Sequence, residues 1–351
     1  MLLEKEKKPF AAVFTSTLLD WYEKNGRSLP WRGITDPYPI WLSEVILQQT
    51  RIQQGWSYWE RFMHRWPTVE QLAAASEDEV LRLWQGLGYY SRARHMHQAA
   101  RQIVTLGGFP SDYAAIRSLK GVGDYTAAAI ASFAFGEPVA VVDGNVYRVL
   151  SRVFGIDVPI NGTEGKKTFT ALANQLIAMD KPASFNQAMM DFGAVQCTPK
   201  SPHCESCPML EMCEAYHTGR VEALPVKLRK TTVKTRYFSY VLVRCAGWIA
   251  VRRRPSGDIW QGLWEPFLIE TPSKADVEKV MRQFEGVGTL TLLKENVRHV
   301  LTHRIILADF YLLEALSRPS LPDDYVWVDE LSYDEYAKPR LIELLMEALN
   351  S

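Results

Sequence analysis

The sequence predicts two domains, a mostly helical domain followed by a smaller α/β domain. A chain of 351 residues exceeds the size of one ordinary hydrophobic core. Apolar residues recur at helical spacing over residues 10–22, 40–49 and 80–87. Beyond Cys213 the sequence changes to short segments rich in β-branched and aromatic residues, which are typical of strands. The helical domain should therefore come first.

We expect the helical domain to span residues 1–225 and the α/β domain residues 237–351, joined by a linker over 226–236. Turn-forming pairs such as Asn25-Gly26 separate the helices of the first domain. The second domain is expected to contain strands over 237–244, 247–252, 289–293 and 304–313 and helices over 274–284 and 339–349.

Composition gives a weaker indication of partners. No segment is apolar over a long enough stretch for a signal peptide or a membrane span, so an intracellular location is expected. The formal net charge is zero, yet between His217 and Arg236 six cations accompany a single acid, Glu222. Such a basic stretch can follow a phosphate backbone or form a solvated linker, and both interpretations stay open. Its cations are Arg220, Lys227, Arg229, Lys230, Lys234 and Arg236.

Four of the five cysteines, Cys197, Cys204, Cys207 and Cys213, fall within 17 residues. In a reducing compartment such clustering indicates a metal site rather than disulfides. Four thiolates suit either zinc or a [4Fe–4S] cluster. Zinc sites usually consist of two short-spaced pairs, and only one such pair exists here, so the iron–sulfur cluster is favoured over zinc. The fifth, Cys245, falls in a predicted strand and is expected to be a buried apolar residue.

Residues 119–136, LKGVGDYTAAAIASFAFG, predict a tight turn between two helices. Gly121 and Gly123 allow the turn, and the small residues after it permit close packing of the second helix. The free backbone N–H groups at the start of that helix can bind a phosphate without reading sequence. A Gly-x-Gly turn between helices is common, so by itself it is a weak indication.

Two acidic residues are candidates for chemistry. Asp143 precedes a predicted helix, whose dipole and free N–H groups favour an ionised carboxylate, although position alone indicates an ordinary N-cap. Glu44 lies on a predicted helix among Trp41, Val45 and Leu47. An acid in apolar surroundings has a raised pKa and can deliver a proton, whereas an acid on the surface would not.

The cysteine spacing closely resembles that of the endonuclease III superfamily of helix-hairpin-helix DNA glycosylases. Residues 119–136 resemble its hairpin, and residues 139–152, VAVVDGNVYRVLSR, resemble its catalytic Asp-Gly-Asn segment. The resemblance implies a structural [4Fe–4S] cluster and a catalytic Asp143, with Asn145 in the same segment. An ionised Asp143 would stabilise or attack an oxocarbenium-like sugar once the base departs.

The largest interval between two cysteines contains Lys200 and His203. Beside a cluster of this family they would either contact DNA phosphate or belong to an ordinary exposed loop.

The segment WLSEVILQQT around Glu44 resembles the adenine-specific branch of the superfamily, the MutY adenine DNA glycosylases. In that branch the glutamate protonates the departing adenine at N7, because adenine leaves poorly as an anion. Bifunctional members carry a hairpin lysine that forms a Schiff base, and Tyr125 stands at the matching position. The resemblance therefore implies a glycosylase without strong lyase activity, in which Tyr125 hydrogen-bonds near Glu44 and the adenine.

An enzyme that acts on a base inside a duplex has to extrude that base and fill the gap. The resemblance implies that Gln49 and Tyr89 act as wedge and stacking residues at the partner base. Trp31 is expected near the adenine pocket, and core packing is the alternative role for such aromatic residues. The expected DNA- and base-binding residues are Trp31, Arg32, Gln48, Gln49, Thr50, Leu87, Gly88, Tyr89, Gly121, Gly123, Thr302 and His303.

Residues 253–267, RRPSGDIWQGLWEPF, resemble the C-terminal domain of the MutY family, which has a Nudix-like fold. The run of metal-binding acids of a Nudix hydrolase does not follow Gly262, so pyrophosphate hydrolysis is not expected. The related domain recognises 8-oxoguanine with a Phe-Ser-His segment. Leu301, Thr302 and His303 stand there in this chain, which keeps the hydroxyl and the imidazole but replaces the Phe.

Taken together, the resemblance implies a base excision repair enzyme that removes adenine mispaired with 8-oxoguanine or guanine in duplex DNA. It would act as a monomer in the cytoplasm, associated with the nucleoid and without a membrane partner. One alternative is a bifunctional glycosylase–lyase for oxidised pyrimidines. A second is a non-catalytic DNA-binding or redox-sensing iron–sulfur protein.

Overall fold

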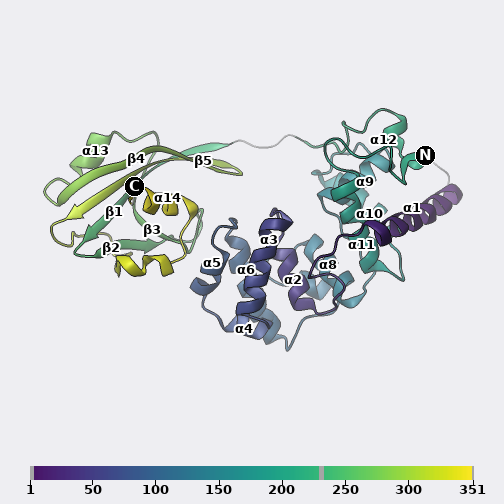
Figure 1. The fold of residues 1–351 in the computed structure, drawn as a ribbon, viewed down its shortest axis with the longest axis horizontal. Helices are drawn as coiled ribbons and strands as arrows, with labels where there is room; N and C mark the ends of the chain where they lie inside the picture. Colours follow the sequence, from purple (N-terminus) through teal and green to yellow (C-terminus); the bar gives the residue numbers. More distant parts are fainter. Residues whose placement is uncertain (1–3, 229–232, 350–351) are drawn as a thin grey trace. The chain divides into compact units, whose positions relative to one another are not determined.

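The computed structural model describes residues 4–228 and 233–349, which form two compact units (Figure 1). One unit comprises residues 1–73 and 98–229, and the other comprises residues 74–97 and 230–351. The second unit therefore takes in a stretch of the N-terminal half, 74–97, as well as the C-terminal part. The predicted boundaries at 225 and 237 stay a prediction. Within the described residues no helix is both long and apolar enough to cross a membrane.

The described part of the first unit is helical, as the apolar spacing predicted (Figure 1). In chain order its helices are α1 (Glu4–Asn25), α2 (Pro37–Ile46), α3 (Ile52–Arg65), α4 (Val69–Ala74), α6 (Ser91–Thr105, shared with the second unit), α7 (Tyr113–Arg117), α8 (Asp124–Phe135), α9 (Gly144–Val153), α10 (Thr163–Leu176) and α11 (Pro182–Asp191). A π-helical turn (Phe192–Gln196), a 3-10 turn (Leu210–Met212) and α12 (Glu214–His217) follow.

Two apolar contact regions position the helices that carry the candidate acids. Phe14, Val149 and Phe169 are fully buried in a core formed by α1, α9, α10 and α11. Ala127 and Ala131 of α8 are also fully buried, and α8 packs against α2. The small side chains allow the close helix packing that the sequence predicted. These contacts fix the starts of α8 and α9, where the hairpin and Asp143 lie.

One predicted helix ends earlier than its apolar spacing indicated. The spacing predicts helix over residues 40–49, but α2 ends at Ile46. A turn follows, in which Gln49 adopts a positive φ of 57°. A non-glycine residue in that region cannot continue a right-handed helix.

The second unit contains α5 (Glu77–Trp84) from the N-terminal half of the chain. Its C-terminal part forms a six-stranded mixed sheet (Figure 1). Its strand order is β4-β5-β1-β3-β2-β6. The strands are β1 (Lys234–Cys245), β2 (Trp248–Arg253), β3 (Trp264–Thr271), β4 (Gly288–Leu301), β5 (Arg304–Ala315) and β6 (Tyr325–Asp329). The remaining elements are α13 (Val277–Arg282), a 3-10 turn (Glu330–Glu335) and α14 (Arg340–Leu349).

The sheet confirms the predicted β1–β2 hairpin, in which Arg244 pairs with Ile249. β1 also runs parallel to β5, which makes the sheet mixed. Two apolar clusters contain alternate residues of β1, one with residues of α14 and the other with residues of α13. The unit is therefore an α/β domain whose sheet is apolar on both faces.

Cys245 corrects one expectation, because it is only partly buried. It is the last residue of β1, directly before the turn at Ala246 and Gly247, and both turn residues have positive φ angles. A strand end beside a turn lies at the edge of the core, so the alternation within the strand does not bury this side chain.

Candidate active site

Glu44 lies in α2, a helix whose residues from Tyr38 to Ile46 are all buried. Asp36 caps its start by accepting the backbone N–H of Tyr38. Only 6% of Glu44 is exposed. Burial raises the pKa of Glu44 to about 7. A hydrogen bond from Tyr125 and the charge of Arg32 lower this pKa, whereas the nearby Asp143 carboxylate raises it further. The expected proton donor is therefore buried as predicted and half protonated near neutral pH.

Tyr125 is the second residue of α8, directly behind the Gly121–Gly123 turn. Its hydroxyl is hydrogen-bonded to the Glu44 carboxyl group, which matches the expected position beside Glu44. Burial raises the pKa of Tyr125 well above its ordinary value, and the charge of Glu44 adds to this rise. The phenol therefore stays neutral and donates its proton to a hydrogen bond at any physiological pH.

Asp143 is the N-cap of α9. Its Oδ1 accepts the backbone N–H groups of Asn145 and Val146, both at 2.8 Å, and its Oδ2 accepts Asn145 Nδ2 at 2.8 Å. We expected these helix-end interactions to lower the pKa of the carboxyl group. Instead the pKa of Asp143 is raised, because burial outweighs the hydrogen bonds.

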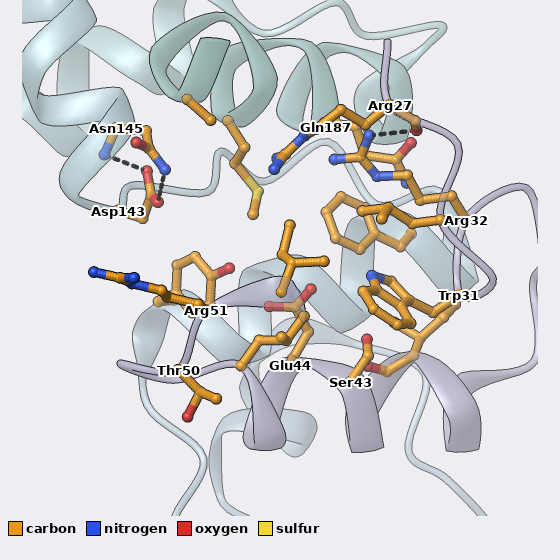
Figure 2. A pocket seen from close by; sticks show the side chains of 18 residues that line it. Arg27, Trp31, Arg32, Ser43, Glu44, Thr50, Arg51, Asp143, Asn145 and Gln187 are labelled. Carbon is orange, nitrogen blue, oxygen red and sulfur yellow. Dashed lines mark hydrogen bonds between the residues drawn. The ribbon is translucent and has the colours of Figure 1, made fainter. Parts of the chain in front are cut away.

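Two adjoining cavities meet at these residues, since both are lined by Glu44, Leu47, Tyr125 and Asp143. The first has a volume of about 290 Å³ and contains expected site residues: Trp31, Arg32, Thr50 and Asn145. In Figure 2, Glu44 approaches this cavity from α2 and Asp143 approaches it from the side of α9. The second has a volume of about 900 Å³ and contains the remaining expected residues of this unit: Gln48, Gln49, Gly121 and Gly123.

Two arginines that line the first cavity, Arg27 and Arg32, are held by an acid that the sequence analysis missed. Asp191 is fully buried and accepts hydrogen bonds from Arg27 and Arg32, with Arg32 Nη1 at 2.6 Å from Oδ2. Burial alone would raise the pKa of Asp191, but the hydrogen bonds from Arg32 and Arg27 outweigh it, so the pKa is lowered. Arg32 is thus fixed at the cavity wall, where Figure 2 shows it beside Trp31. An acid inside the apolar segment AMMDFG was the available signal.

Trp31 lies at a cavity wall and is also packed against other aromatic residues, and its expected place near the adenine stays a prediction. It lines the first cavity, and its ring packs against Trp56 and Trp59 with centroids 5.7 and 5.5 Å apart. Only 6% of Trp31 is exposed. Trp56 and Trp59 therefore support the Trp31 ring from behind, and Trp31 itself forms the aromatic part of the cavity wall.

The expected wedge residues have unusual backbones. Gln49 in the first unit has a φ of 57° and Tyr89 in the second has a φ of 47°. Both are exposed. Non-glycine residues in the left-handed region store strain and cluster at functional sites.

The other expected residues of the second unit fall in two loops. Tyr89 and Gly88 follow α5, and Thr302 and His303 form the turn between β4 and β5. The structure brings the loops together, because the Tyr89 hydroxyl lies 2.5 Å from Thr302 Oγ1. Leu87, in contrast, is buried with 7% exposed.

The four clustered cysteines line a single pocket between α9 and the loop over residues 197–213. Burial raises the pKa of Cys207 to about 12, and the three neighbouring thiols contribute to this rise. Within the described residues no three His, Cys, Asp or Glu side chains are placed to hold a single metal ion. Four soft ligands around one pocket, without convergence on one point, fit a cluster with separated corners better than a zinc ion. Lys200 and His203 are exposed in this loop, so their two interpretations stay open.

Two arginines of α9 connect this loop to the segment that carries Asp143, and sequence reasoning missed both. Arg148 donates through Nε to the Cys197 carbonyl at 2.7 Å and through Nη2 to Asn145 Oδ1 at 2.8 Å. Arg152 lies 3.4 Å from Cys197 Sγ through Nη1 and donates to the carbonyl of Thr198 at 2.7 Å. Two arginines four residues apart in an apolar helix were the available signal.

Replacement of Arg152 by Met should destabilise the protein by about 3 kcal/mol and lower its iron content. Arg152 is only 2% exposed and donates to several backbone carbonyls, which would lose their partners. Urea unfolding of the iron-loaded protein and iron analysis measure both effects. Arg82→Met, at an exposed position of α5, is the matched control. Equal stability of the two variants would contradict a structural role for Arg152.

Two cations of the basic stretch between His217 and Arg236 form ion pairs with acids of the protein. Arg236 forms ion pairs with Asp258 and Glu270 at 2.6 and 2.7 Å. Arg220 lies 3.5 Å from Asp157. Lys227 and Lys234 are exposed, whereas Arg229 and Lys230 lie outside the described residues.

Comparison with known proteins gives the family. A family model described as HhH-GPD superfamily base excision DNA repair protein matches residues 42–175, and one described as NUDIX domain matches residues 239–348. A third, the iron-sulfur binding domain of endonuclease III, matches residues 197–213. The adenine DNA glycosylase of Buchnera aphidicola subsp. Baizongia pistaciae is 32% identical, with 82% of this chain and 83% of that protein covered. The chain belongs to the adenine DNA glycosylase family. This confirms the resemblance, the two-part fold and the iron–sulfur segment, whose cysteines hold a [4Fe–4S] cluster.

Other members of the adenine DNA glycosylase family are longer. The mouse (Mus musculus) adenine DNA glycosylase is 41% identical over 252 residues, which cover 67% of this chain and 49% of the mouse protein. The aligned part thus spans about half the length of that relative. The solved structure of a thermostable thymine-DNA glycosylase superposes with a TM-score of 0.56 at 32% identity. It covers 60% of this chain and 99% of its own.

Proposed function

We propose that the chain is a DNA repair glycosylase that hydrolyses the N-glycosidic bond of adenine opposite 8-oxoguanine or guanine in duplex DNA. The observation that carries this proposal is the meeting of two cavities at Glu44 and Asp143. One acid has a pKa of about 7, and the other accepts hydrogen bonds from backbone N–H groups at a helix start, which favour its ionised form. Two carboxyl groups with such different environments suit an acid and a charge stabiliser.

The two cavities suggest a division of the substrate between them. The first, with the wall of Trp31 and the fixed Arg32, suits the flat extruded base. The second, lined by Gly121 and Gly123, suits the sugar-phosphate backbone, which the hairpin N–H groups can bind. The N-glycosidic bond would then lie where the cavities meet, beside both acids.

Each acid then has one task. Protonated Glu44 donates its proton to N7 of adenine, so that the base leaves as a neutral molecule. Asp143 stabilises the resulting oxocarbenium-like sugar or bonds to its anomeric carbon, and water completes the hydrolysis. If a covalent intermediate forms, the configuration is retained overall. The four cysteines that line one pocket would hold the [4Fe–4S] cluster, which would order the cysteine loop and take no part in bond cleavage.

Strand cleavage through a Schiff base is not part of this proposal. Such cleavage needs an amine that attacks the sugar, and the hairpin position carries Tyr125 instead. Among the described residues that line the first cavity there is no lysine.

The mispair would be read by the second unit. The Tyr89 and Thr302 hydroxyl groups are hydrogen-bonded to each other, and half of the Tyr89 side chain is exposed. An exposed aromatic ring next to polar groups can stack on a base and contact its edge. We assign recognition of the 8-oxoguanine partner to this pair, with Thr302 in place of the family's serine.

One assay separates the candidate functions. The protein is incubated with duplexes that contain adenine opposite 8-oxoguanine, adenine opposite guanine, or thymine glycol, and products are compared before and after alkali. We expect breaks only after alkali and only at adenine. Breaks without alkali at thymine glycol would indicate a glycosylase–lyase, and no breaks at all would indicate a non-catalytic binding protein.

The rate of adenine release should fall as the pH rises above 7. Glu44 must be protonated to act, and its pKa is about 7, so the active fraction falls about tenfold for each further pH unit. Asp143 must be ionised, and because its pKa is raised the rate should also fall in acid. Single-turnover rates measured from acidic to alkaline pH report both limbs. A rate that stays constant above neutrality would exclude Glu44 as the acid.

A further inference from the structure

The second cavity extends beyond the hairpin to a wall that no expected residue occupies. Besides Glu44, Asp143 and the hairpin glycines, it is lined by side chains of α9 and α10. These are Tyr147, Lys166, Thr170 and Asn174. Lys166 is the fourth residue of α10 and is exposed. The hairpin thus faces a second wall that carries a cation.

The charges around this cavity leave Lys166 available. The charge of Lys166 acts on one acid of the lining, Asp124, whose carboxylate is bound by Arg117 Nε at 2.6 Å. That hydrogen bond holds the pKa of Asp124 below its ordinary value. The positive charge of Lys166 lowers the same pKa, but Lys166 forms no hydrogen bond with Asp124. Within the described residues no acid forms an ion pair with Lys166. Among the described lining residues it is also the one lysine or arginine.

The other polar groups of this wall have partners or carry no charge. Asn174 Oδ1 accepts the backbone N–H of Ala140 at 2.9 Å. Tyr147 packs its ring against Phe169 with centroids 5.2 Å apart. The wall is therefore held in place by contacts in the protein. Among the described residues, no acid forms an ion pair with the ammonium group of Lys166.

We propose that Lys166 binds a backbone phosphate of the DNA strand that carries the adenine, across the cavity from the phosphate bound by the hairpin. The inference rests on the proposed function, because it assumes that this strand occupies the second cavity. Backbone N–H groups bind a phosphate on one wall and a lysine neutralises another on the opposite wall. Such a contact adds affinity and orientation without reading sequence.

The chain supplies a matched control in the next residue. Lys167 has the same charge, lies on the same helix and is also exposed, but it does not line the cavity. Successive helical residues point about 100° apart, so the two lysines face different directions. A general effect of removing one positive charge from this surface would act equally at both positions.

The test measures binding of an adenine·8-oxoguanine duplex to the iron-loaded full chain across a range of salt concentrations. Glu44→Gln is present throughout to prevent turnover. Lys166→Ala should weaken binding severalfold at low salt and reduce the slope of log K against log salt by about 1. Lys166→Arg should restore the slope, and Lys167→Ala should leave it unchanged. Equal slopes for the parent and Lys166→Ala, or equal losses for both alanine variants, would overturn the proposal.

A second measurement locates the phosphate. Neutral methylphosphonates are placed singly along the adenine strand, and binding is compared for the parent and Lys166→Ala. At one position the methylphosphonate should weaken DNA binding by the parent but not by Lys166→Ala, because that variant has already lost the contact with the phosphate. Additive losses at every position would refute a direct contact.

Adenine release is measured separately, with Glu44 intact and a range of DNA concentrations. Lys166→Ala should need more DNA to reach its maximal rate, since a phosphate contact positions the strand rather than takes part in bond cleavage, and Lys167→Ala should behave like the parent. Absence of adenine release from the parent chain, together with the Lys166-specific loss of slope, would refute the proposed function but support the phosphate contact.

Discussion

Replacement of Glu44 by Gln should slow adenine release by roughly 10²- to 10⁴-fold while the protein still binds the duplex. Gln has nearly the same shape as Glu and can still accept the hydrogen bond from Tyr125, but it cannot donate a proton of suitable acidity. Glu44 is buried and its pKa is about 7, so the native group is well placed to give up a proton at neutral pH. Single-turnover adenine release and equilibrium binding measure the two effects separately.

Glu23→Gln, at an exposed position of α1, is the control for loss of one carboxylate from the same unit. The Glu44 variant should also lose the alkaline limb of the pH profile, because that limb reports the group that was removed. Near-parental adenine release by Glu44→Gln would exclude the proposed acid. Loss of both binding and release would indicate a folding role instead.

Replacement of Asp143 by Asn should reduce adenine release by roughly 10³-fold with little loss of stability. Asn is as good an N-cap as Asp, and its side-chain oxygen can keep the hydrogen bonds from the backbone of Asn145 and Val146. The substitution therefore removes the negative charge that would face a cationic sugar and preserves the helix start. Single-turnover rates and thermal unfolding of the variant measure the two properties.

Asp143→Ala separates the two roles of this residue. It removes the cap as well as the charge, so it should lose a further ~1 kcal/mol of stability and be no more active than the Asn variant. Near-parental activity of Asp143→Asn would show that capping, not charge, is the contribution of Asp143.

The candidate site residues could be picked out from the sequence where short segments mark them. Glu44, Tyr125 and Asp143 stand in three separate motifs, and the structure brings all three around the same pair of cavities. The direction of the Asp143 pKa was not predictable from its helix position. Burial by residues distant in sequence outweighs three local hydrogen bonds, and a one-dimensional pattern does not report that burial.

The supporting residues were missed for a related reason. Arg32 and Asp191 lie 159 positions apart, and Arg148 reaches Cys197 across 49 positions. Neither interaction leaves a local pattern, because Arg32, Asp191 and Arg148 are ordinary charged side chains within their own segments and their partners lie far away in the sequence. Long-range hydrogen bonds of this kind are visible only once the helices are packed.

The strand pairings of the sheet were also predictable only where the strands are close in sequence. The β1–β2 hairpin was predictable because its two strands are adjacent in sequence and joined by Ala246-Gly247. β3 was not predicted, since Pro266 within it argues against a strand. The parallel pairing of β1 with β5 joins segments about 70 residues apart, and no local signal specifies it.

The burial of Glu44 also has a thermodynamic consequence for the whole fold. Its pKa is about 7 in the folded protein against an ordinary 4.5, so the native state binds the proton more tightly than the unfolded chain. Stability from this group is therefore fully present below pH 4.5 and is lost as the pH rises through 7. At about 1.4 kcal/mol per pKa unit, the ionised carboxylate destabilises the alkaline protein by about 3 kcal/mol. The residue that makes the chain a candidate catalyst thus makes it less resistant to unfolding in base, and natural selection would have to retain it against that loss.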